Sequence, residues 1–159
     1  MSFPDRVYTT EEVNEAKELI DKGYKHNIAV KGSSAFSEKV KRSLELVKTA
    51  GYHDFLRTYI RSIEEIDGLT QLHVADVAIW ANRYAVENPV DAASIFIQKA
   101  HHMKEYLEGR LYYGGQAEKR SNKKRIELLE ALRSRSTEKE VVAECERLIQ
   151  LWHESSLVY

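Results

Sequence analysis

The sequence predicts an all-α protein, a single-domain bundle of six to seven helices with short antiparallel connections. Apolar residues recur at three- and four-residue spacing through most of the 159 residues. Only two prolines occur, Pro4 and Pro89. No stretch alternates apolar and polar residues over the length of an ordinary strand. A chain of this length buries a core without disulfides, so we expect one domain over residues 1–159.

The element boundaries come from caps and glycines. Thr9 and Glu12 have capping-box spacing, and Ser33 or Ser34 opens a helix that ends at Gly51. Residues 24–33 break the helical pattern and predict a loop or a very short extended piece. The predicted helices are 9–23, 33–51, 52–68, 70–87, 90–111, one after Gly115 and a last one from Thr137.

The pair of helices over 70–87 and 90–111 dominates the pattern, because it carries Trp80 and the most apolar run of the chain. At about 100° per residue, Trp80 falls on a narrow polar strip of the first helix, with His73 at its edge. On the second helix, Ser94, His101 and Glu105 share a face that we expect to meet solvent. The expected core stripe of that helix is Ala93, Phe96, Ala100, Met103, Leu107 and Leu111.

The apolar surface of this pair exceeds what one core contact needs, and two interpretations stay open. The pair is either the central hairpin of the bundle, buried from several sides, or a surface that binds a protein partner or forms a homodimer. An engineered binder on a natural helical scaffold would show the same pattern. The predicted partner-binding residues are Trp80, Ile95, His102 and Tyr106, with His73 and Ile97 at the margins. If a partner buries His73 or His102, association weakens as the pH falls through the imidazole range.

The residue types that carry chemistry are sparse. His73, Asp76 and His102 could meet between antiparallel helices and bind a metal, but neither helix has a two-ligand motif. Cys145 lies on an apolar stripe, where a cysteine is an inert small hydrophobe. We therefore predict no catalytic residue, no metal and no cofactor, and a binding function in preference to an enzymatic one.

Charge and hydropathy limit the partners. The formal net charge is -1, and the basic residues are interleaved with acidic ones, which does not favour nucleic acid. No apolar run has the roughly 18 residues of a membrane span. With a single cysteine and no apolar leader, the sequence predicts a soluble, cytoplasmic protein.

The alternative function is enzymatic. Arg147 and His153 have the arginine-to-histidine spacing of the all-helical HEPN ribonucleases, which this segment resembles in those two residues. The resemblance implies RNA cleavage by that pair. Leu148 departs from the family pattern, in which a polar residue follows the arginine. A small metal-dependent hydrolase using His73, Asp76 and His102 is the other form of this alternative.

Overall fold

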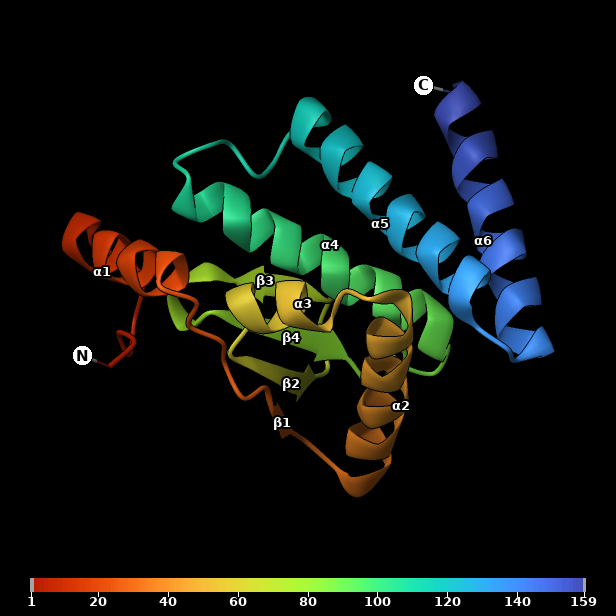
Figure 1. Ribbon diagram of the computed structural model, residues 1–159, viewed down its shortest axis with the longest axis horizontal. Coiled ribbons are helices and arrows are strands. Elements are labelled where there is room, and N and C mark those ends of the chain that lie inside the picture. Colours follow the sequence, from red (N-terminus) through yellow and green to blue (C-terminus); the bar gives the residue numbers. More distant parts are fainter. Residues whose placement is uncertain (1, 159) are drawn as a thin grey trace.

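A computed structural model describes residues 2–158, with side chains as far as residue 155, and it is an α/β protein (Figure 1). The all-α prediction is therefore wrong, because four strands form one mixed sheet. The helices are α1 Thr10–Asp21, α2 Ser34–Ala50, α3 His53–Tyr59, the 3-10 helix η1 Val74–Asp76, α4 Pro89–Leu107, α5 Gly115–Arg135 and α6 Lys139–Val158. The strands are β1 Ala29–Lys31, β2 Ser62–Ile66, β3 Gln71–His73 and β4 Ala78–Asn82. No helix within residues 2–158 combines the length and apolar character that crossing a bilayer requires.

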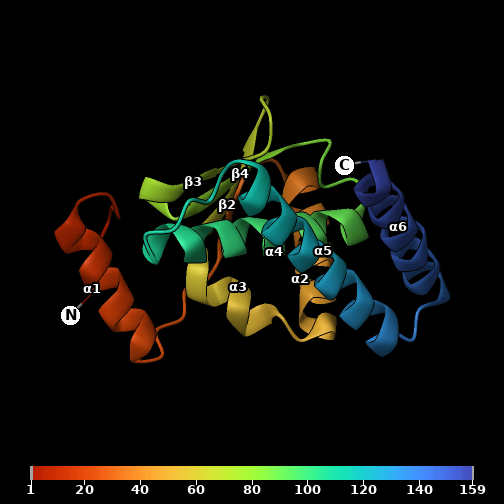
Figure 2. The same cartoon turned by 90° about the horizontal axis from the view of Figure 1, so that it is seen from above.

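The sheet has the order β1-β2-β4-β3. Strands β1, β2 and β4 run parallel, and β3 pairs antiparallel with β4 at one edge. Helices α2, α3 and α4 lie on the same side of the sheet, and no described helix covers its other side (Figure 2). Ile63 and Ile79 point toward the helices and are fully buried in a core that also contains Phe36, Leu56 and Phe96. One face of the sheet therefore belongs to the core.

The predicted helix 70–87 is instead β3, η1 and β4 with their turns. Its apolar residues form an almost continuous run, and a strand buried in a parallel sheet produces the same run. Val77 separates η1 from β4 because it adopts a left-handed conformation with φ of 57°. A β-branched residue rarely takes that conformation, so the sequence contains no cue for the break.

The predicted helix 52–68 also divides, into α3 and β2. Ile60, Ile63 and Ile66 have helical spacing in the sequence, which suggested one continuous apolar stripe. In the structure Ile60 caps the end of α3, while Ile63 and Ile66 lie in β2 three positions apart and so on opposite faces of the sheet. β-branched isoleucines favour that extended conformation.

The helices with clear end signals are confirmed. Thr9 accepts a hydrogen bond from the backbone N–H of Glu12, and the Glu12 carboxylate accepts one from Thr9 N–H, which completes the capping box of α1. Ser33 caps α2 by accepting from Phe36 N–H at 3.2 Å, and Gly51 ends it in the left-handed conformation. These contacts lie within a few residues of one another, which is why the sequence predicts them.

Helix α4 is the centre of the helical layer, with Phe96, Ala100 and Met103 fully buried as predicted. The face expected to meet solvent is instead covered by α5: Ser94 is fully buried and Glu105 is 1 % exposed. That expectation was wrong because α5 brings basic and amide side chains that pair with this polar face. The pairs are Arg125 with Asp91 and Ser94, Gln98 with Ser121 and Asn122, and Arg120 with Glu105. Leu111, predicted in the core, lies beyond α4 and is 65 % exposed.

Candidate functional site

The side of the sheet that faces away from the helices carries ten side chains, which we call the open sheet face. Strand register aligns Lys31, Glu64, Trp80 and Gln71 in one row across all four strands. Side chains alternate along a strand, so residues two positions from these lie on the same face. The open sheet face consists of Ala29, Lys31, Ser62, Glu64, Ile66, Gln71, His73, Ala78, Trp80 and Asn82.

A stacked aromatic pair occupies the centre of the open sheet face. The rings of His73 and Trp80 lie 4.1 Å apart between centroids and are nearly parallel, at 6°. The antiparallel register pairs His73 with Ala78, which places its ring diagonally beside Trp80 on the neighbouring strand. Nδ1 of His73 lies 2.7 Å from Oδ2 of Asp76, which orients the imidazole ring. Trp80 is half-buried, with one ring face against His73.

The polar groups around this pair carry both signs of charge. Lys31 is exposed at the β1 edge, and the Glu64 carboxylate accepts a hydrogen bond from Ser62 Oγ at 2.8 Å. The Asn82 side chain donates to the carbonyl oxygens of Asp67 and Gly68, at 3.0 and 2.8 Å, and so holds the turn between β2 and β3. The open sheet face is therefore an aromatic centre with a polar, nearly charge-balanced border.

The structure divides the six predicted partner-binding residues between two places. Trp80 and His73 lie together on the open sheet face, whereas Ile95, Ile97, His102 and Tyr106 lie on α4. Ile97 is fully buried in the core, and Ile95 is half-buried.

The two polar members on α4 also have contacts or burial within this chain. Tyr106 donates its hydroxyl to the carbonyl oxygen of Val7 at 2.9 Å. His102 is 7 % exposed, and burial lowers the pKa of its imidazole to about 4. Its Nε2 has no hydrogen-bond partner among the described residues. These positions therefore contribute to internal packing of the helical layer.

The residues of the enzymatic alternatives do not converge. His73 is close to Asp76, but His102 is buried on α4, and no group of three or more His, Cys, Asp or Glu side chains among residues 2–158 could hold a metal ion. Arg147 is held by Glu144, one turn earlier on the exposed surface of α6, with Nε to carboxylate distances of 2.8 and 3.1 Å. His153 lies exposed on the same helix.

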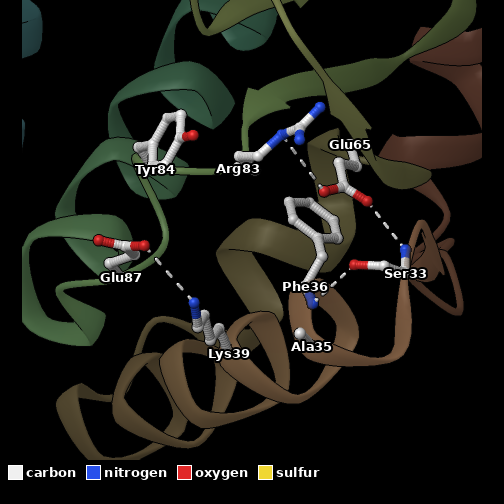
Figure 3. Close-up of a pocket in the computed structure, with 8 residues that line it drawn as sticks. All are labelled: Ser33, Ala35, Phe36, Lys39, Glu65, Arg83, Tyr84 and Glu87. Atoms are coloured by element: carbon white, nitrogen blue, oxygen red, sulfur yellow. Dashed lines mark hydrogen bonds and ion pairs between the residues drawn. The ribbon is translucent and has the colours of Figure 1, made fainter.

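A cavity that the sequence does not indicate lies where the parallel strands end (Figure 3). It has a volume of about 370 Å³ and is on the helix side of the sheet. Its lining residues are Ser33, Ala35, Phe36, Lys39, Glu65, Arg83, Tyr84 and Glu87. Glu65, Arg83, Tyr84 and Glu87 fall in segments predicted as continuous helix that are strand or turn in the structure, which is why the sequence did not bring the lining together. The polar residues that follow Val30 are the one feature of the sequence that could have indicated the end of a strand beside this cavity.

Gly32 allows the chain to turn tightly beside this cavity. A Cβ at residue 32 would lie 2.7 Å from the Phe36 ring and 2.8 Å from Glu65 Cβ. The Glu65 carboxylate in turn accepts a hydrogen bond from Ser33 N–H at 2.8 Å. The end of β2 is therefore tied directly to the start of α2.

Comparison of the chain with protein-family models, curated proteins and solved structures finds no match in any of the three.

Proposed function

We propose that this chain is a polypeptide-binding module whose contact surface is the open sheet face, and that the occupant is a second copy of the chain. The observation that carries the proposal is the position of Trp80. It stands at the centre of a sheet face that no described helix covers, and His73 holds its ring in place. A large, pre-oriented aromatic side chain with a polar border is the usual anchor of a protein interface.

Charge favours a protein over a nucleic acid as the occupant. The open sheet face has Lys31 at one edge and Glu64 beside it, so it offers no continuous positive surface to a phosphate backbone. Two arginines of α5 are also unavailable to a phosphate backbone, because Arg120 pairs with Glu105 and Arg125 with Asp91. A face that carries one cation and one anion can oppose a copy of itself without a net like-charge penalty.

The edges of the sheet favour a contact between the sheet faces of two copies over the pairing of an edge strand with a strand of the second copy. The edge strands β1 and β3 have only three residues each, and β1 ends in a lysine. Short edge strands that carry lysine discourage pairing with another chain. The contact we propose therefore buries Trp80 without extending the sheet.

We include a cytoplasmic location in the proposal. Cys145 is the single cysteine of the chain, and it is buried and free. Burial raises the pKa of its thiol to about 11, so it has little tendency to form a mixed disulfide. A chain that gains nothing from an oxidising environment suits a reducing compartment.

Light scattering coupled to size exclusion tests the proposal with the purified chain. We expect the mass to rise with concentration from 18.4 kDa toward twice that value, together with a shift in tryptophan emission as Trp80 leaves water. Trp80→Ala should abolish both changes. Leu151→Ala, which removes an exposed leucine on α6 (45 % exposed), is the matched control and should dimerise as the parent does. A monomer at every concentration contradicts the proposal.

A further inference from the structure

The cavity at the ends of the parallel strands is a second candidate site, independent of the open sheet face. It lies beyond the carboxyl ends of β1, β2 and β4, the position at which open α/β sheets bind their ligands. Its volume of about 370 Å³ falls at the small end of the range for ligand pockets. We propose that it binds a small zwitterion that carries one ammonium and one carboxylate group, a free amino acid or a dipeptide.

The charges around the cavity alternate in sign. Lys39 of α2 faces Glu87, which precedes α4, and Arg83 after β4 faces Glu65 at the end of β2 (Figure 3). The cavity lining therefore contains two cations and two anions. At the rim, Arg83 also contacts Asp67. A ligand with one charge of each sign can satisfy both sets, whereas an ion of single sign is repelled by half of the lining.

Both ion pairs are too long for good hydrogen bonds. The Lys39 to Glu87 distance is 3.7 Å, and the Arg83 Nε to Glu65 distance is 3.9 Å. A charge-assisted N–H···O bond is about 2.8 Å long. Lys39 and Glu87 therefore keep free donors and acceptors, and so do Arg83 and Glu65 at the atoms that Asp67 and Ser33 do not engage. Ligand groups inserted between the partners would engage these atoms.

The remaining walls suit the carbon skeleton of such a ligand. Phe36, only 2 % exposed, forms the floor of the cavity, and Tyr84, 69 % exposed, stands at its side (Figure 3). Glu65 is anchored by Ser33 N–H and is only 19 % exposed in its side chain. A fixed, largely buried carboxylate beside an aromatic floor is a favourable site for the ammonium group. Lys39 and Arg83 remain for the carboxylate.

Amide NMR of the full chain tests this inference directly. The probes are free amino acids and alanine-containing dipeptides, each added up to about 10 mM. We expect saturable shifts at the amides of Ser33, Ala35, Glu65 and Tyr84 for at least one probe. Blocking its amino group by acetylation, or its carboxylate by amidation, should weaken binding about tenfold or more.

Charge-neutral variants identify the groups responsible. Glu65→Gln and Lys39→Gln should each weaken binding about tenfold while the amide spectrum outside the cavity stays unchanged. Glu38→Gln and Lys41→Gln, exposed positions on the same helix, are the matched controls and should bind as the parent does. No saturable shift with any probe, equal binding of blocked and unblocked forms, or tighter binding of inorganic phosphate at the same amides would each overturn the inference.

Discussion

Acid should destabilise this protein well above the pH at which its carboxylates titrate, because two histidines are buried without an acidic partner. His26 is 2 % exposed and packs edge-on against the rings of Phe3 and Tyr24, at centroid distances of 4.5 and 5.0 Å. Burial, and then the nearby charges of Arg61 and Arg57, lower its pKa to about 4.

The second histidine is His102 on α4. Burial lowers its pKa to about 4, and Lys99 acts in the same direction. Glu105 opposes this shift, but its carboxylate is already paired with Arg120. Neither histidine is therefore protonated in the folded chain near neutral pH.

The sign and size of the effect follow from these values. The ordinary pKa of both groups is 6.5, so the unfolded chain binds more protons than the folded chain as the pH falls from 6.5 toward 4. Their contribution to stability is complete above pH 6.5 and is lost on acidification. At pH 5 the loss is about 2 kcal/mol for each histidine, or about 4 kcal/mol together. That is a large part of the roughly 5–15 kcal/mol that holds a domain folded.

Urea unfolding between about pH 7.5 and 5 measures this loss as a fall in the unfolding free energy. His26→Phe keeps the aromatic packing and His102→Leu keeps the volume, and each should reduce the loss at pH 5 by about 2 kcal/mol. Leu151→Ala changes an exposed residue and no titratable group, and it is the control that should keep the full dependence. An unfolding free energy that stays constant over this range, or an unchanged slope in both buried-site variants, would refute the reasoning.

Four further substitutions, two of them combined in a double variant, test the packing by urea unfolding. Gly51→Ala should cost about 1–2 kcal/mol or more, because φ is +84° and the new Cβ would collide with Arg135, whose guanidinium caps α2. An unchanged midpoint would contradict this close contact. Asp91→Ala should cost about 3 kcal/mol by leaving Arg125 buried and unpaired, and adding Arg125→Met should recover most of that loss. Gly32→Ala should cost about 1–3 kcal/mol through overpacking at the strand end, and a stability equal to the parent's would exclude the tight turn.

The helices with local end signals could be predicted, but of the sheet only β1 could, as the very short extended piece that was one alternative for residues 24–33. Thr9, Ser33 and Gly51 act through contacts within four residues, so the sequence carries their full information. The strands β1 and β3 have three residues each, too few to show a period of two. In β4, the run Ala78-Ile79-Trp80-Ala81 is apolar on both faces and is equally compatible with a buried helix.

Trp80 was selected from the sequence for a reason that does not hold in the structure. Its partial exposure was predicted from a polar strip on a helix, but it arises from the strand alternation that directs Ile79 inward and Trp80 outward. The cavity is formed by residues that are far apart in the sequence. Ser33 and Glu65 are 32 residues apart, and they meet only through the parallel pairing of β1 and β2. No local pattern encodes such a pairing.

The paired polar groups between α4 and α5 determine more than stability. Sliding α5 along α4 by one turn, about 5.4 Å, would separate Arg120 from Glu105 and Arg125 from Asp91. The buried Glu105 carboxylate would then lose its arginine partner. A contact lined only by leucines would tolerate such a slide, because every turn of α5 would present the same apolar surface to α4. The polar pairs therefore specify one register of α5 along α4. Because α6 packs against α5, they also determine the position of α6.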